Sequence, residues 1–426
     1  MRLMFAAVAL AFAAPAAAET VVVTADRMVD VLAGRIVEEP VVVITDGRIA
    51  SVVGRGGARP IIPEGATRID LPGHTLLPGL IDMHVHLDSN PRYGGYSGLQ
   101  FTDTFWVAQG VSNARDMLRA GFTTLRNVGS ENYSDVGIKQ AIEEGLIAGP
   151  RIVPAAHALS ATGGHCDSTY FPPSMQQRGR AVADGPQALR TMVREQRKYG
   201  AEVIKVCATG GVFSRNTEPG QQQLSEEELR AIADEAHQWG LRVAAHAHGA
   251  AGIQAAIRAG IDTIEHASLI DAEGIRLARE HGTFLVMDIF NTEYTQAEGA
   301  RNGVLEDNLR KDREIAQIQR DNFRAAHDAG VRMAFGTDAG VMPHATAAGQ
   351  FRYMVEYGMT PMEAIQSATR NAALALGREA DVGAIAVGRF GDLIAVDGDP
   401  TADVRQLEDV DVVIKSGEVA ADLRGE

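Results

Sequence analysis

Residues 80–86 read LIDMHVH, an apolar run that ends in two histidines two positions apart. Successive side chains of a β-strand point to opposite faces, so His84 and His86 point to the same side. Further apolar runs also carry a residue that can bind a metal near their ends: EVIKVCA (202–208), LRVAAHAHG (241–249), DTIEHAS (262–268) and RMAFGTDAG (332–340). If these runs are strands of one barrel, their ends meet at one mouth, where such barrels carry their catalytic residues.

The whole region from Leu76 to Glu379 alternates between apolar runs and amphipathic segments, the pattern of a parallel sheet with helices. Eight runs are candidate strands: 76–86, 123–128, 151–156, 202–208, 242–247, 262–267, 283–288 and 332–339. Helices are expected between them, for example from a Ser225 cap to Gly240, over 249–260 and over 306–329. Eight strands in roughly 300 residues predict an α/β fold, a (β/α)8 TIM barrel over residues 76–379.

The two ends of the chain have a different pattern of apolar and polar residues from the barrel region. Residues 19–75 and 380–426 alternate apolar and polar positions and contain glycine-rich turns, which indicates short strands. Neither piece has enough apolar positions for a core of its own. We therefore expect them to form one small β-sandwich domain together, with the barrel inserted between its two parts.

The first 18 residues have the features of a secretory signal peptide. Arg2 supplies a positive start, an Ala/Leu/Phe/Val run follows, and Ala16–Ala18 fits the small-residue cleavage site. A membrane anchor is the alternative, but the run is short for crossing a bilayer and Pro15 interrupts it. We expect cleavage after Ala18 and export across the inner membrane, to the periplasm in a Gram-negative host.

The amino-acid composition and net charge indicate which binding partners the protein can have. Of 426 residues, 45% are hydrophobic and 22% are charged, as in ordinary soluble domains. The formal net charge of -15 disfavours nucleic acid and anionic membrane surfaces as partners. The chain has no heptad pattern that would support oligomerisation, although a homo-oligomer stays open.

The two cysteines are too few for a disulfide framework. Cys207 lies in an apolar strand, where a small buried side chain is its expected role. Cys166 follows His165 in a glycine-rich loop and is a weak candidate to approach a metal, because the histidines and Asp338 already make a complete ligand set.

Each ligand candidate has an ordinary structural alternative. A single histidine on a strand is more often a core residue whose ring nitrogens are satisfied than a metal ligand. His246, His266 and Asp338 lie near the ends of three further predicted strands. So many metal-binding residues at strand ends are not explained by chance, and together with His84 and His86 they predict a metal site. Zinc is the default ion for nitrogen-rich ligands, and manganese, cobalt or iron are alternatives.

Lys205 lies inside the apolar run VIKVCA. Burial disfavours its charged form and lowers its pKa. It could be an ion-paired structural lysine. A neutral amine can also react with carbon dioxide to give a carbamate, an anionic ligand able to bridge two cations, and the surrounding histidines favour this second role.

This constellation resembles the binuclear amidohydrolase superfamily. The shared motifs are LPGLIDMHVH (77–86), TLRNVG (124–129), GTDAG (336–340) and VGRFGDLIAVDGDP (387–400). The resemblance covers nearly the whole mature chain and is strongest to a subgroup with Xaa-Pro dipeptidase-like and ochratoxin-type amide hydrolases. It implies that one cation is bound by His84, His86 and Asp338, the other by His246 and His266, with carboxylated Lys205 shared.

Two neighbouring cations can acidify a shared water to hydroxide and polarise a carbonyl. Asp338 is the candidate to take the water's proton and pass it to the leaving nitrogen. The predicted function is hydrolysis of the amide bond of dipeptides or N-acyl amino acids with a free carboxylate, including ochratoxin-type amides.

Substrate contacts must come from outside the ligand set. His248 faces the same side as His246 and could contact the scissile carbonyl or a carboxylate, or hold a ligand in place. The two long loops after the third and fourth strands, 160–180 and 210–223, are expected over the mouth. Within them, His165 and Arg215 are candidates to bind a substrate carboxylate, and Tyr170 is a further candidate for substrate contact. Asp88 could receive an amine or cap a loop.

Two other functions compete with this prediction. Imidazolonepropionase-like or dihydroorotase-like opening of a cyclic amide is one, although the imidazolonepropionase type uses one metal and lacks the bridging lysine. A non-catalytic metal-binding scaffold is the other, and the complete ligand set with Asp338 disfavours it.

Overall fold

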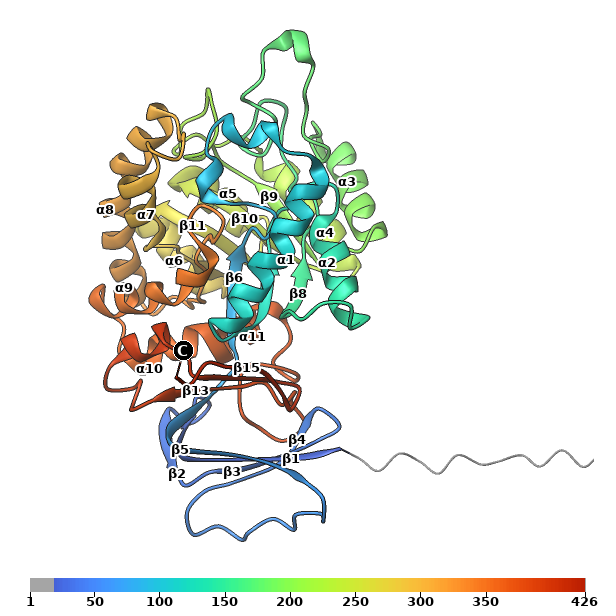
Figure 1. Cartoon of the computed structure of the whole chain (residues 1–426). Helices are drawn as coiled ribbons and strands as arrows, with labels where there is room; N and C mark the ends of the chain where they lie inside the picture. Colours follow the sequence, from blue (N-terminus) through green and yellow to red (C-terminus); the bar gives the residue numbers. More distant parts are fainter. Residues whose placement is uncertain (1–18, 426) are drawn as a thin grey trace, which may run out of the picture.

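The computed structural model describes residues 19–425, so the predicted signal peptide lies outside the described residues. Two regions stand one above the other in Figure 1: a layered β region made from both ends of the described chain, and a larger α/β region with helices around its outside. No helix in the described part of the chain is long and apolar enough to cross a membrane.

Strands from both chain ends form one eight-stranded sheet in the order β15-β14-β13-β5-β1-β3-β4, with β2 paired to β1. Their bounds are β1 (Thr20–Asp30), β2 (Arg35–Glu38), β3 (Val41–Thr45), β4 (Arg48–Val53), β5 (Thr67–Pro78), β13 (Leu393–Asp397), β14 (Val412–Lys415) and β15 (Glu418–Asp422). Strand β5 connects the two ends, since it pairs with β1 and with β13. Val23, Ile44, Leu76, Leu393 and Ile414 share one buried cluster, so both ends bury their apolar faces together as the sequence predicts.

The α/β region has two sets of parallel strands, ordered β6-β7-β8 and β12-β11-β10-β9. Their bounds are β6 (Leu80–Val85), β7 (Phe122–Asn127), β8 (Arg151–Pro154), β9 (Val203–Cys207), β10 (Arg242–Gly249), β11 (Thr263–Leu269) and β12 (Phe284–Val286). A parallel bridge between Leu159 and Val206 links the segment after β8 to β9. Nearly every residue of these strands is buried, as expected for strands covered on both faces.

The eighth predicted strand is not a regular strand. Residues 332–339 instead form single parallel bridges, Met333 with Leu285 of β12 and Ala339 with Val85 of β6. The bridges close the parallel segments into a ring, which is consistent with the predicted barrel. Gly336 packs so closely on β12 that a Cβ there would lie 2.3 Å from Val286 Cγ1. Asp338 has a positive φ of 57°, which departs from the extended backbone of a strand. The backbone of Asp338, a predicted site residue, therefore ends the extended conformation of this segment.

Helices follow the strands and cover the outside of the ring (Figure 1). They are α1 (Asp103–Arg119), α2 (Ser134–Glu143), α3 (Pro186–Lys198), α4 (Glu226–Gln238), α5 (Ala250–Arg258), α6 (Ala272–His281), α7 (Asn291–Glu298), α8 (Glu306–Asp328), α9 (Gln350–Glu356), α10 (Pro361–Gln366) and α11 (Ala372–Leu376). Ser225 caps α4 in a capping box with Glu228, which confirms the predicted start of that helix. The predicted helices over 249–260 and 306–329 are also confirmed.

Short helical turns lie in the loops, and three of them bear on the site. These are η1 (Pro91–Tyr93), η2 (Ser97–Gln100) and η3 (Pro173–Met175). The remaining turns are η4 (His344–Gly349), η5 (Ser367–Asn371) and η6 (Val404–Glu408).

Candidate metal centre and substrate cavity

All six predicted ligands line one cavity of about 880 Å³ at the carboxyl ends of the parallel segments. The ligands come from different parts of the ring: His84 and His86 at the end of β6, Lys205 on β9, His246 on β10, His266 on β11 and Asp338 on the segment that closes the ring. Parallel strands present their carboxyl ends on the same side, so residues up to 254 positions apart meet here.

Three groups of side chains each bring their ligand atoms within 4.8 Å of one another: His84, His86 and Asp338; His246, His248 and His266; and His266, Asp288 and Asp338. Within the first group, Asp338 Oδ1 lies 3.4 Å from both His84 Nε2 and His86 Nε2. The third group connects the other two, because it shares Asp338 with the first group and His266 with the second. Three imidazoles, or two imidazoles with one carboxylate, are donor sets typical of catalytic divalent metals.

Four histidines of the centre have a lowered pKa, which favours the neutral form that binds a metal. Burial, followed by the charge of Lys205, lowers the pKa of His86 to about 4. Burial also lowers the pKa of His84, His246 and His248 well below the usual value. His266 differs, because Asp288 outweighs the effect of burial and raises its pKa.

Lys205 is 3% exposed, and its Nζ has no hydrogen-bond partner within residues 19–425. Burial lowers its pKa to about 8, against the opposing effect of Glu265 and Asp338. A buried amine without a partner is costly, so such a group calls for an explanation. Burial also raises the pKa of Asp338 to about 7. The centre thus holds a lysine and an aspartate that are both pushed toward their neutral forms.

A buried ion pair positions His84. Its Nδ1 lies 2.9 Å from Glu265 Oε2, and the other oxygen of Glu265 accepts a hydrogen bond of 2.7 Å from Arg126 Nη2. Arg126 and Glu265 are 1% and 0% exposed. A carboxylate on the second ring nitrogen fixes the tautomer, and leaves Nε2 free to face the cavity.

Asp288 orients the ring of His266, as Glu265 orients the ring of His84. Its two carboxylate oxygens lie 2.9 and 3.0 Å from His266 Nδ1, and Gln319 donates to Asp288 Oδ1. The sequence prediction missed Asp288, Glu265 and Arg126 as functional residues. A signal was present, since each is a charged residue in or directly after an apolar predicted strand.

The predicted substrate residues divide between two places. His165 lines the metal cavity, where its ring stacks on His246 with centroids 4.1 Å apart and its Nδ1 lies 2.8 Å from Ser214 Oγ. His248 also lines this cavity, with Nδ1 2.8 Å from Ser268 Oγ. Asp88 borders it too, but accepts hydrogen bonds from Ser130 Oγ and the Glu131 amide, as a residue that caps a loop does.

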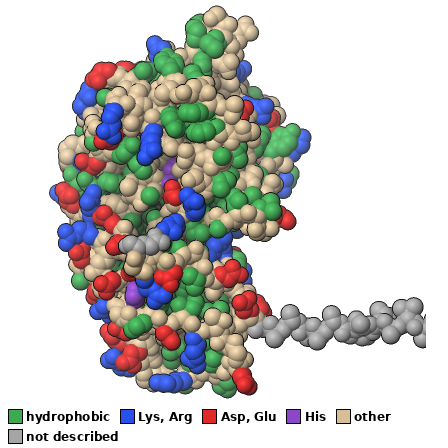
Figure 2. Space-filling model, viewed as in Figure 1, with side chains coloured by type: hydrophobic (Ala, Val, Ile, Leu, Met, Phe, Trp, Pro, Cys, Tyr) green, Lys and Arg blue, Asp and Glu red, His purple; other side chains and the backbone are tan. Residues whose placement is uncertain are grey.

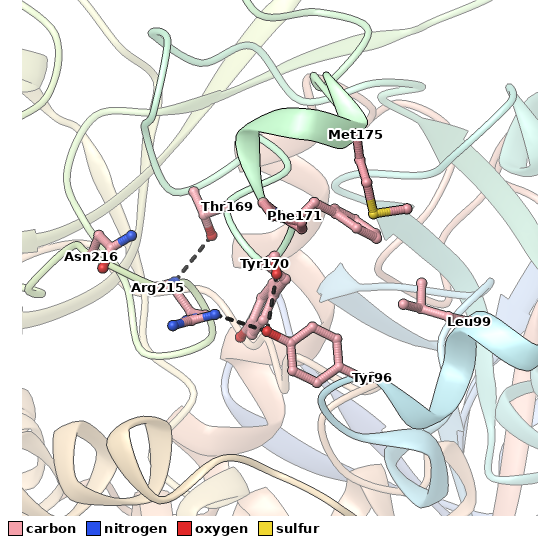
Figure 3. Close-up of a pocket in the computed structure, with 9 residues that line it drawn as sticks. Tyr96, Leu99, Thr169, Tyr170, Phe171, Met175, Arg215 and Asn216 are labelled. Atoms are coloured by element: carbon pink, nitrogen blue, oxygen red, sulfur yellow. Dashed lines mark hydrogen bonds between the residues drawn. The ribbon is translucent and has the colours of Figure 1, made fainter.

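Arg215 and Tyr170 do not line the metal cavity. They line a neighbouring pocket, in which Arg215 donates to the hydroxyl of Tyr96 at 2.9 Å (Figure 3). Arg178 and Arg180 line the metal cavity in their place. Arg178 donates to the Val182 carbonyl and lies 3.8 Å from Asp184. Within residues 19–425 the guanidinium of Arg180 makes neither a hydrogen bond nor an ion pair, and its charge acts on Glu131 and His157.

A disulfide joins Cys166 to Cys207, with the two Cα atoms 6.0 Å apart. The expected burial of Cys207 is confirmed, at 0% exposure. The interpretation of Cys166 as a thiol near a metal is wrong, because its sulfur is bonded to Cys207. The bond ties the long loop that carries His165 to the end of β9, two residues after Lys205. Sequence spacing alone could not reveal it, because the two residues are 41 positions apart and meet only once the loop folds back.

The amidohydrolase family matches residues 75–420, and the chain belongs to this family. Over 392 residues the chain is 34% identical to ochratoxinase from Aspergillus niger, covering 86% of this chain and 79% of that protein. A solved Xaa-Pro dipeptidase with methionine bound in its active site is 35% identical, with a TM-score of 0.88 over 94% of this chain and 99% of that one.

A prolidase complexed with N-methylphosphonate-L-proline is 33% identical, with a TM-score of 0.86 over 95% of this chain and 100% of that one. The predicted resemblance to an ochratoxinase-like and dipeptidase-like subgroup is confirmed. The chain is thus an amide hydrolase of the amidohydrolase family, whose members generally bind divalent metals.

We expect the disulfide to contribute to stability by restricting the unfolded chain. Replacing Cys166 by Ser should lower the free energy of unfolding by about 4 kcal/mol, the scale for closing a loop of this length. Peptide mapping of the purified protein without reductant should find residues 166 and 207 in one linked species. Two free thiols in that material would contradict the assignment.

Proposed function

We propose that the chain is a metal-dependent hydrolase on a (β/α)8 barrel, cleaving the amide bond of dipeptides or N-acyl amino acids that carry a free carboxylate, ochratoxin-type amides included. The observation that carries this proposal is that two histidine-containing groups share one cavity with Lys205, whose Nζ is buried without a hydrogen-bond partner in residues 19–425 and whose charge acts on His84, His86 and His266. A mononuclear centre for opening a cyclic amide would leave that lysine unexplained.

The residues present fit a pair of cations. His84, His86 and Asp338 would hold one ion, and His246 and His266 the other, with Lys205 between them as a carbamate. A neutral amine attacks carbon dioxide and releases one proton to water, which leaves the carbamate anion, and burial favours the neutral amine of Lys205. The carbamate would place two oxygens where Nζ now has no partner. Nitrogen-rich donors favour zinc.

Two divalent cations bound here would supply Lewis acidity, which lowers the pKa of water and polarises a carbonyl. The protein supplies the proton transfers. The carboxylate of Asp338 faces both histidines of the first group, so it is placed to accept a proton from the attacking water and return it to the leaving nitrogen. His248 and His165 border the same space and would orient the scissile amide.

Export to an oxidising compartment is part of the proposal. The first 18 residues have the pattern of a cleaved signal peptide. The disulfide between Cys166 and Cys207 supports export, because such bonds persist mainly outside the reducing cytosol. The periplasm of a Gram-negative host is the compartment that fits best.

A substrate panel assayed with and without a chelator tests the proposal. It should include N-acyl amino acids, Xaa-Pro, Xaa-Arg and Xaa-Phe dipeptides, and cyclic amides such as dihydroorotate. We expect turnover of linear amides with a free carboxylate, loss of that turnover after chelation, and recovery with zinc. Turnover of cyclic amides alone would overturn the proposal in favour of ring opening, and activity that resists chelation would overturn the role of the metal.

Asp338→Asn tests the proton carrier. The amide keeps the size and one oxygen of the carboxylate but cannot accept the proton, so kcat should fall about 100-fold or more while most metal stays bound. Metal content by mass spectrometry and kcat on the best panel substrate measure the two effects. A near-normal kcat with full metal content would show that another group moves the proton.

Arg180, rather than Arg215, is the proposed partner of the substrate carboxylate, because it lines the metal cavity and lacks a hydrogen bond or ion pair within residues 19–425. Arg180→Gln should raise KM for a free-carboxylate substrate about tenfold or more, since a charged hydrogen bond is lost. The matched control is Arg178→Gln in the same loop, whose guanidinium is already engaged by Val182 and Asp184. Equal effects of the two variants would contradict this role.

A further inference from the structure

Helix α8 lies against the ring with polar residues on its buried side. A helix that packs on a sheet usually buries an apolar stripe. Four of the eight buried residues of α8 are instead polar: Asn308, Lys311, Asp312 and Gln319. Figure 1 places α8 at the left of the ring, and Figure 2 shows charged side chains of both signs on that flank, as expected for the side toward solvent. The helix therefore carries polar residues toward the ring as well as toward water, and the inner ones need an explanation.

Lys311 is the least expected of these buried residues. It is 0% exposed, and none of the proposed steps of amide hydrolysis uses it. Its Nζ donates a hydrogen bond of 2.8 Å to the Ser214 carbonyl and lies 2.9 Å from Oδ2 of half-exposed Asp307. A buried ammonium group loses its hydration, and an apolar side chain of the same size often serves stability as well or better. The stability of the fold alone therefore does not account for Lys311.

Ser214, whose carbonyl accepts the hydrogen bond from Lys311, contacts His165 through its hydroxyl. Ser214 Oγ lies 2.8 Å from His165 Nδ1. The imidazole ring is also confined by its neighbours, since it stacks on His246 and a Cβ on Gly211 would lie 2.3 Å from its Cε1. A hydrogen bond at one ring nitrogen fixes how the ring is turned. The position of Ser214 thus determines how His165 is oriented in the cavity.

The same arrangement occurs a second time along α8. Asn322 Nδ2 donates a hydrogen bond of 2.9 Å to the Ser268 carbonyl, and Ser268 Oγ lies 2.8 Å from His248 Nδ1. Lys311 and Asn322 are 11 positions apart, which is about three turns of an α-helix, so they lie on the same face. Two side chains from one face of α8 thus hold two serines, and each serine contacts one histidine of the cavity.

The contacts of α8 extend to three segments that end at the cavity. His165 and His248 border the cavity without belonging to the proposed ligand set. Gln319, which lies between the two positions on the same face, donates to Asp288, the residue that orients His266. The helix therefore reaches the segments after β9 and β12 as well as β11 itself. A single rigid helix that contacts all three segments can hold their side chains at fixed positions relative to one another.

We propose that Lys311 is a positioning residue for amide hydrolysis: it holds Ser214, and Ser214 orients His165 toward the scissile amide. Asn322 holds His248 in the same way. The proposal rests on the proposed function and adds to it two residues that contact neither the substrate nor the metals. Their effect on the reaction passes through the two histidines that border the cavity.

Lys311→Met removes the ammonium group and keeps a long side chain. We expect kcat on the best panel substrate to fall about 10- to 100-fold, because a small misplacement of an orienting group is costly, while the metal content is unchanged. Lys311→Gln keeps a hydrogen-bond donor and should lose less, which provides a second variant. The matched control is Arg310→Gln, which breaks a surface ion pair between α8 and Glu218 of the same loop and should keep kcat within about twofold.

A double-mutant cycle with His165 distinguishes positioning from a general effect on the fold. If Lys311 acts through His165, Lys311→Met should change kcat by no more than about twofold in His165→Ala protein, because the group that it orients is gone. A merely structural role would lower kcat by the same factor with and without His165, and that result would overturn the proposal. The cycle of Asn322→Leu with His248→Ala should show the same loss of additivity.

Chemical modification separates this proposal from the proposed function. If the metal-loaded protein hydrolyses no amide, amide hydrolysis fails as the function, and the rate at which diethyl pyrocarbonate modifies His165 still tests the contact. Relative to exposed His281, that rate should rise about fivefold in Lys311→Met, the scale for losing one hydrogen bond, and stay unchanged in Arg310→Gln. Peptide mass spectrometry measures both histidines in one sample. Equal rates in the two variants would overturn the positioning of His165 whatever the activity.

Discussion

The buried pair of Arg126 and Glu265 is the interaction on which the centre depends. Charges inside a ring of strands are costly unless each has a partner. Arg126 bonds Glu265, Glu265 holds His84, and a further bond from Arg126 Nε to the Met83 carbonyl fixes the strand that carries His84. The pair thus places a ligand from β6 relative to β7 and β11, and its two charges satisfy each other inside the apolar core.

The same principle extends around the cavity. Asp288 and Gln319 hold His266, while Asp82 accepts from the backbone amide of His84 and from Thr337 beside Asp338. His84 and His266 are thereby each left with one ring nitrogen toward the cavity. Lys205 differs, since its Nζ has no hydrogen-bond partner in the described chain. A set of donors held from behind and open in front suits metal binding and amide hydrolysis.

The loops above the ring supply side chains that border the metal cavity in addition to those of the strands. The segment 160–180 brings His165 against His246, places Arg180 at the cavity and is tied to β9 by the disulfide. Together with residues 93–101 and Arg215 it also builds an apolar pocket next to the centre. The division is typical of this architecture: rigid strands carry the chemistry, and variable loops set the substrate.

Much of the fold and the centre could be predicted from the sequence. The period of the apolar runs gave seven regular strands and the main helices, and the capping box at Ser225 marked a helix start. The meeting of His84, Lys205 and Asp338 at one cavity could be predicted because each lies on a segment whose direction is fixed by the parallel ring. The eighth strand was the exception, because the left-handed backbone of Asp338 departs from the extended geometry of a strand.

By itself the sequence determined the order of strands and helices, the residue types of the centre and the family, since periodicity and spacing are local properties of the chain. Only the tertiary structure decided which loop residues reach the cavity. Arg180 does and Arg215 does not, Cys166 meets Cys207, and Glu265, Arg126 and Asp288 hold the ligands from behind. Loop paths and buried ion pairs depend on contacts between residues far apart in the chain, and no local pattern specifies such contacts.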